Sequence, residues 1–238
     1  MIKNRPALAV SVGVFLAVET VLGILFQTGY GNGAHLRYAT VVLACLFCVF
    51  LAERTREYLL LQLALVATVS ADFFLVLPAS PNQLPGMLCF SVAQLAYAAF
   101  LALSESRPRY LRLQLWLRGI ASVVAPVATL IVLGKGADAV AIVSVFYYAH
   151  LILNLIFAWT QLPRRALMAV GLTLFLLCDT VIGLSFLDGY LVVDKTSLIY
   201  RIIHPGFDLA WAFYLPSQML LSISLLPKRW KAGDPSAQ

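Results

Sequence analysis

The stretch LFLLCDTVIGLSF, residues 174–186, carries one aspartate, Asp179, inside an apolar run that is long enough to cross a membrane. A second stretch, ATVSADFFLVL at residues 67–77, has the same character and contains Asp72. A carboxylate in hydrocarbon costs roughly 2.5–3.5 kcal/mol even on the mildest insertion scale, so such an acid usually faces the interior of a helix bundle and has a function. These two stretches therefore decide the class of fold and the place where function is sought.

The composition of the whole chain is that of an integral membrane protein. Of its 238 residues, 61% are hydrophobic and 12% are charged, which is about half the charged share of a soluble domain. An apolar run of about 20 residues spans about 30 Å of hydrocarbon, and backbone groups in lipid must form their hydrogen bonds within helices. The sequence thus predicts an all-α polytopic membrane protein, a single integral membrane domain over residues 1–238. Its eight transmembrane helices are expected near residues 7–27, 36–52, 58–78, 86–104, 115–134, 138–162, 166–187 and 202–226.

The positive charges indicate an orientation in the membrane and no nucleic-acid partner. With the N-terminus inside, most of the 17 Lys and Arg residues fall in cytoplasmic segments, near residues 3–5, 54–56, 107–118, 164–165 and 228–231. Four fall on the other side: Arg37, Lys135, Lys195 and Arg201. The positive-inside rule then predicts that both termini are cytoplasmic, in a membrane that we expect to be the bacterial inner membrane.

Two connecting segments have further expected roles. The outer loop 188–201 is long enough to cover a site entrance. The segment 105–118 alternates Arg with Leu, Tyr and Trp, and indicates either an amphipathic stretch at the membrane interface or a solvated loop.

Several polar side chains are expected at a similar depth to the two aspartates, given a rise of about 1.5 Å per helical residue. Three- and four-residue spacing also gathers them into stripes on single helix faces. Such stripes face one another or a wet cavity, although polar groups that merely join helices are the competing interpretation for His150 and Glu19. The candidates for positioning water or a substrate headgroup are Gln94, Tyr97, Tyr147, His150, Tyr214 and Gln218.

Two buried carboxyl groups suit general acid–base catalysis. Apolar surroundings favour the neutral form of a carboxyl group, and a second carboxyl nearby makes it favourable for the pair to share one proton. One carboxyl can then donate a proton while the other accepts one. Reactions that pass through an oxocarbenium-like cation, such as cleavage of a glycoside or of a vinyl ether, use this division of roles. The sequence predicts neither a metal site nor another cofactor, because there is no His cluster at metal spacing and the Cys45-x-x-Cys48 pair stands alone.

Four segments resemble the YhhN-like integral membrane lysoplasmalogenases. They are SADFFLVL at 70–77, CFSVAQLAYAAF at 89–100, LFLLCDTVIGLSF at 174–186 and FYLPSQMLLSIS at 213–224, and the length and expected topology agree as well. The resemblance implies hydrolysis of the vinyl ether bond of a lysoplasmalogen, which gives a fatty aldehyde and a glycerophospho-ethanolamine or -choline. It also implies that Asp72 and Asp179 are the catalytic acids.

The segments depart from the family pattern at three neighbours of the aspartates. Ala71 and Cys178 precede the two aspartates where the family has Gly and Ser, and Gln94 replaces a common histidine, while Tyr97 is kept. Because an amide does not titrate, Gln94 transfers no proton. Two other functions remain open: a proton-coupled carrier of a small or lipidic solute, and a non-catalytic lipid-binding member of the family.

Overall fold

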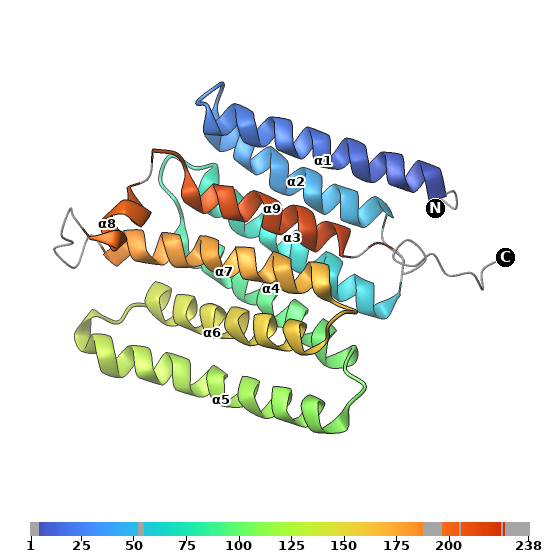
Figure 1. Cartoon of the computed structure of the whole chain (residues 1–238). Coiled ribbons are helices and arrows are strands. Elements are labelled where there is room, and N and C mark those ends of the chain that lie inside the picture. The colour runs from blue at the N-terminus through green and yellow to red at the C-terminus, as the bar shows by residue number, and fades with distance from the viewer. Residues whose placement is uncertain (1–4, 52–54, 188–196, 205, 225, 227–238) are drawn as a thin grey trace.

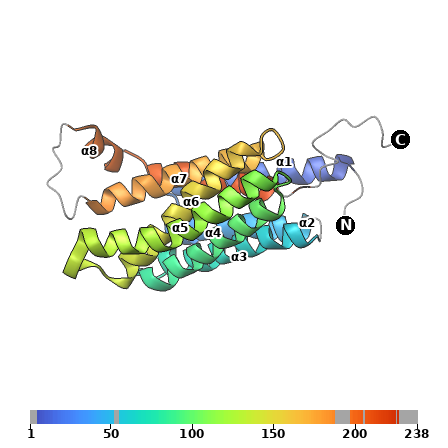
Figure 2. The same ribbon diagram turned by 90° about the horizontal axis from the view of Figure 1, so that it is seen from below.

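The structure is a computed structural model that describes residues 5–51, 55–187, 197–204, 206–224 and 226. Long helices run side by side in alternating directions, and the regular structure of this part of the chain is all helical (Figures 1 and 2). The elements are α1 (Arg5–Gln27), α2 (Gly33–Leu51), α3 (Arg56–Val76), α4 (Gln83–Leu103), α5 (Pro108–Leu133), the short 3₁₀ turn η1 (Gly134–Gly136), α6 (Ala139–Thr160), α7 (Ala166–Leu187), α8 (Leu198–Ile203) and α9 (Leu209–Ile223).

Six helices form a closed ring. In order around it, α2 packs on α3, α3 on α4, α4 on α6, α6 on α7, α7 on α9, and α9 returns to α2. The largest cluster of buried apolar side chains fills this ring, with Tyr97, Phe100, Phe157 and Phe175 among its bulkiest members. The other two long helices lie outside: α1 packs against α2 and α9, and α5 packs mainly against α6 (Figure 1).

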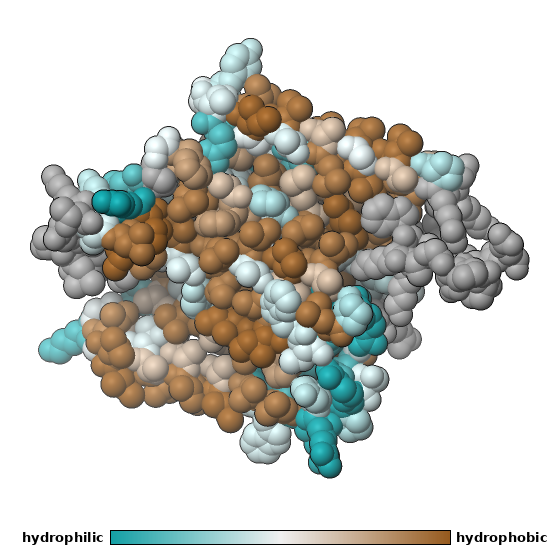
Figure 3. Space-filling model, in the orientation of Figure 1, coloured by the Kyte–Doolittle hydropathy of each residue, from teal (hydrophilic) through white to brown (hydrophobic). Residues whose placement is uncertain are grey.

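The outer surface is that of a membrane-embedded bundle. Apolar residues cover the middle of the helices in the view of Figure 3, and hydrophilic residues gather towards their ends. Among the described residues, seven helices are long and apolar enough to cross a membrane: α1 to α7. The all-α membrane fold is therefore confirmed. The predicted count of eight spans and the inward position of both termini remain predictions.

The predicted helix over 202–226 is wrong as a single element. The described residues instead form α8 and the 15-residue α9, with a break between them. The residue before a proline is disfavoured in the helical conformation, and His204, which precedes Pro205, has φ −123° and ψ 52°. Asp208 then starts α9, because its carboxylate accepts a hydrogen bond from the Trp211 backbone N–H.

The helix predicted over 115–134 begins earlier than expected, and this decides against one of the two alternatives for the segment 105–118. Residues 108–118 form the first turns of α5, so they are not a solvated loop. Pro108 occupies the first turn, where its fixed φ suits a helix and its missing N–H costs nothing. Most of the loop 188–201, expected to cover a site entrance, lies outside the described residues.

Candidate active site

A cavity of about 550 Å³ opens at one end of the ring. Its walls come from the last turns of α3 and α7 and the first turns of α4, α6 and α9, so it lies where the α3–α4 and α5–α6 connections meet. On the predicted orientation this is the outer end. The volume is typical of a small-molecule site. The lining is mostly apolar and includes Leu75, Met87, Phe90, Ile182 and Phe186.

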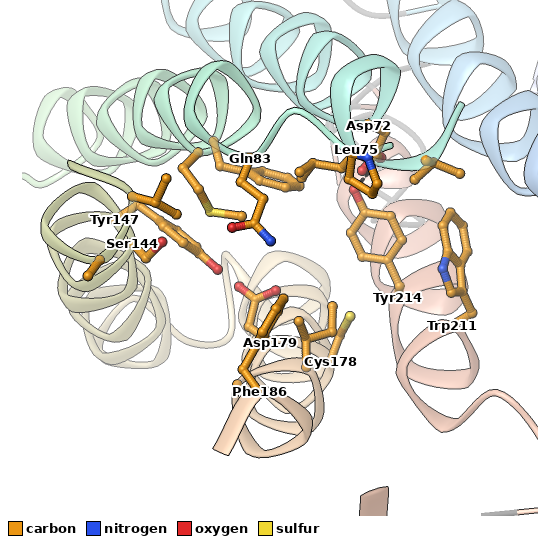
Figure 4. A pocket seen from close by; sticks show the side chains of 18 of the residues that line it. Asp72, Leu75, Gln83, Ser144, Tyr147, Cys178, Asp179, Phe186, Trp211 and Tyr214 are labelled. Atoms are coloured by element: carbon orange, nitrogen blue, oxygen red, sulfur yellow. Dashed lines mark hydrogen bonds between the residues drawn. The ribbon is translucent and has the colours of Figure 1, made fainter. Parts of the chain in front are cut away.

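Both aspartates line this one cavity (Figure 4). Asp72 comes from α3 and Asp179 from α7, and the two residues are 3% and 7% exposed. The ring explains why the two aspartates share one cavity. The helices α3 and α7 stand on opposite sides of the ring and run the same way, so residues near their C-terminal ends lie at the same end of the bundle. Two acids that are 107 residues apart in sequence therefore share one buried space.

Tyr214 holds Asp72. Its hydroxyl donates a hydrogen bond of 2.6 Å to Asp72 Oδ2, and both residues are buried. The Tyr214 ring is itself fixed between Phe175, with ring centroids 5.5 Å apart, and Trp211, at 5.0 Å. The Thr68 hydroxyl, one turn before Asp72, donates instead to the Ala64 carbonyl at 2.9 Å.

Asp179 is held less tightly. The Tyr147 hydroxyl from α6 points towards its carboxyl (Figure 4). Asp179 Oδ2 is buried and has no hydrogen-bond partner among the described residues. One aspartate thus has an acceptor oxygen fixed by a hydrogen bond, while the other has a buried oxygen that accepts none from the described residues.

The other four predicted site residues do not line the cavity. Gln94 is enclosed between α4 and α6, where Asn154 Nδ2 donates to its side-chain and backbone oxygens, each at 2.9 Å. His150 turns towards α5 and meets the Ser122 hydroxyl at 3.1 Å. Tyr97 and Gln218 are 1% exposed, and their polar side-chain atoms have no partner among the described residues. Their role in substrate binding remains a prediction.

Gln83 is a cavity residue that the sequence analysis missed. Its amide points into the cavity, towards Asp179 (Figure 4). The predicted helix began at residue 86, whereas α4 begins at Gln83, so this side chain was assigned to a loop. The polar pair Asn82-Gln83 ahead of an apolar run was the available signal for an earlier helix start.

A charged pair lies beside the cavity at the start of α9. Arg37 from α2 forms a salt bridge of 2.5 Å with Asp208, and the two side chains are 29% and 30% exposed. The side chain of Gln27, the last residue of α1, forms hydrogen bonds with the backbone of the same aspartate. Its Nε2 donates to the Asp208 carbonyl at 2.8 Å, and its Oε1 accepts from the Asp208 N–H at 3.0 Å.

The cavity offers carboxyl, phenol and amide groups, and the described residues contain no group of three or more His, Cys, Asp or Glu side chains that could hold a metal ion. The chemistry that its residues provide is proton transfer.

A family model matches residues 34–225, which include every residue that lines the cavity. The chain belongs to the YhhN family. YhhN proteins are generally associated with lysoplasmalogenase activity. The match begins at the start of α2, so α1, with Glu19 and Gln27, lies outside it. No curated protein and no solved structure matches the chain.

Proposed function

We propose that this protein hydrolyses the vinyl ether bond of lysoplasmalogens in the membrane, with Asp72 and Asp179 as the acid–base pair. The observation that carries the proposal is that both carboxyl groups line one largely apolar cavity. An apolar wall suits a lipid chain, and paired carboxyls suit a reaction that needs both a proton donor and a proton acceptor. The family match over most of the chain supports the same activity.

The two aspartates suit different roles. Asp179 is proposed as the acid, because it lines the cavity and its buried Oδ2 accepts no hydrogen bond from the described residues, which favours the protonated over the ionised carboxyl. Asp72 is proposed as the base, because its Oδ2 already acts as an acceptor for the Tyr214 hydroxyl. A fixed acceptor is well placed to orient water, since catalytic proton transfer requires a defined geometry.

The reaction then balances without a cofactor. Asp179 gives its proton to the alkenyl carbon that is β to the ether oxygen, and the ether oxygen stabilises the resulting cation. Water adds to the cationic carbon while Asp72 takes a proton from it. The hemiacetal collapses to an aldehyde and an alcohol, and the proton held by Asp72 returns to Asp179 through water. One water is consumed, and both carboxyl groups end as they began.

An aldehyde-release assay tests the proposal. Purified protein in detergent is given a lysoplasmalogen, and wild type is compared with Asp72→Asn and Asp179→Asn, each of which removes a proton-transfer group with little change of shape. We expect both variants to lose activity by at least about a hundredfold, since a general acid or base contributes typically 10²–10⁴. Glu19→Gln is the matched control, because Glu19 is a buried carboxyl outside the cavity.

The assay also separates the rival functions. Absence of aldehyde with wild type, together with uptake into vesicles that depends on a pH difference, would replace the proposal with a proton-coupled carrier. Full activity in both asparagine variants would remove the aspartates from the chemistry. An equal loss of activity in Glu19→Gln would mean that the losses come from the effect of removing a buried carboxyl on folding, and not from chemistry in the cavity.

A further inference from the structure

The Arg37–Asp208 pair has more binding capacity than its structural role uses. Asp208 caps α9 through its carboxylate, a task that an asparagine performs equally well. Its backbone is held separately, by the two hydrogen bonds that it forms with the Gln27 side chain, one as acceptor and one as donor. Arg37 has five N–H donors, and among the described residues its guanidinium donates a hydrogen bond through Nη2 to Asp208, so that other donors remain for a ligand. Both charged groups remain partly exposed.

This pair is connected to the cavity through Trp211. The Trp211 ring lines the cavity on one side, and the Arg37 guanidinium lies 5.7 Å from its centroid. Asp208 precedes Tyr214, the partner of Asp72, by six residues, which is about 9 Å along a helix. A positive and a negative group therefore stand about 9 Å further out than the proposed base.

We propose that Arg37 and Asp208 form a headgroup site, in which Arg37 binds the phosphate and Asp208 the ammonium group of a zwitterionic lysophospholipid. This inference rests on the proposed function for the identity of the substrate. Guanidinium groups favour phosphate oxygens, and the carboxylate beside an indole ring favours an ammonium group.

The spacing supports the assignment. In an extended chain three bonds cover about 3.8 Å, as between consecutive Cα atoms. Six bonds separate the reacting vinyl ether carbon from the phosphorus of a lysoplasmalogen, which is then about 7–8 Å. This length is close to the rise of about 9 Å between the Arg37–Asp208 pair and the Tyr214–Asp72 contact, so that a phosphate at Arg37 is within reach. A lysolipid with its headgroup at the pair would thus place its vinyl ether at the two aspartates.

Kinetics with two substrates test the headgroup site. One substrate is a lysoplasmalogen with a phosphoethanolamine headgroup, and the other is a 1-alkenylglycerol that lacks the phosphate. We expect Arg37→Gln to raise KM for the first about tenfold or more and to leave kcat within about twofold, while the second is unaffected. Lys135→Gln, which removes an exposed cation at the same end of the bundle, is the matched control. Equal losses on both substrates would overturn the proposal, because they would mean that Arg37 acts only through the fold.

Asp208→Asn tests the other charge and keeps the helix cap. We expect this variant to lose the preference for phosphoethanolamine over phosphoglycerol headgroups. Unchanged preference would overturn the assignment of the ammonium group to Asp208.

Binding separates this inference from the proposed reaction. A 1-acyl lysophosphatidylethanolamine has the headgroup without the vinyl ether, and its effect on thermal unfolding reports binding even if no aldehyde is ever released. We expect it to protect wild type and Asp179→Asn but not Arg37→Gln. Protection by inorganic phosphate alone would assign the site to free phosphate and overturn the headgroup proposal, as would equal protection of wild type and Arg37→Gln by the lysolipid.

Discussion

The hydrogen bond between Tyr214 and Asp72 can be removed by a single atom change, Tyr214→Phe. The phenylalanine ring keeps the contacts with Phe175 and Trp211, so the packing of α9 on α7 is preserved. What is lost is the 2.6 Å bond to Asp72 Oδ2, which joins two almost completely buried residues.

The size of the effect follows from the nature of that bond. A hydrogen bond to a charged group contributes about 1.5–3 kcal/mol. If Asp72 accepts a proton from water in the transition state, removal of this hydrogen bond raises the activation free energy by most of that amount. Since each 1.36 kcal/mol is a factor of ten, kcat/KM should fall by about 10- to 150-fold.

Initial rates of aldehyde release in detergent, together with thermal unfolding of each variant, provide the measurement. Tyr148→Phe is the control, since it also removes a tyrosine hydroxyl bond between helices, to Thr180 at 2.9 Å, but outside the cavity. We expect its activity to stay within about twofold of wild type. If Tyr214→Phe is as active as wild type while Asp72→Asn is inactive, the assignment of Tyr214 as the residue that positions Asp72 is wrong.

Two further predictions concern carboxyl groups away from the cavity. Glu19 is completely buried and both of its oxygens lack a partner among the described residues, so Glu19→Leu should raise the free energy of unfolding by about 1–3 kcal/mol, seen as a higher Tm in detergent; a lower Tm would mean that Glu19 has a partner. Glu105, between α4 and α5, accepts hydrogen bonds from Arg107, and this contact holds the pKa of the carboxyl below its ordinary value. The stabilisation it provides is therefore full above a pH of about 4.3 and is lost as the pH falls through the lower folded pKa, so the Tm difference between wild type and Glu105→Gln should be largest near neutral pH and shrink in acid; a constant difference would contradict this.

Much of this fold follows from hydropathy, since a helix that crosses a membrane must be about 20 residues long and predominantly apolar. The predicted boundaries of the helices that became α1 to α4, α6 and α7 accordingly lie within a few residues of the observed ones. The break between α8 and α9 was missed because apolar residues lie on both sides of it. The sequence His204-Pro205-Gly206 was the local sign of that break.

The site was predictable only in part, because a helix face shows which residues point together but not which neighbour they meet. Asp72 and Asp179 were found because their burial demanded an interior. His150 shares a stripe with Tyr147, yet three residues of helix turn it far enough to reach Ser122 on α5. The pairing of Arg37 with Asp208 joins residues 171 apart, and nothing in the local sequence of either predicts it.

The shortness of α9 has a consequence for the surrounding lipid. Its 15 residues measure about 22 Å, against about 30 Å for the hydrocarbon layer, and Figure 1 shows it beginning well inside the end of α7. A short span is accommodated by local thinning of the bilayer or by water that enters the gap. If α9 is the predicted last span, the leaflet next to it should dip towards Trp211, and a lipid in that leaflet would reach the cavity sideways without first leaving the membrane.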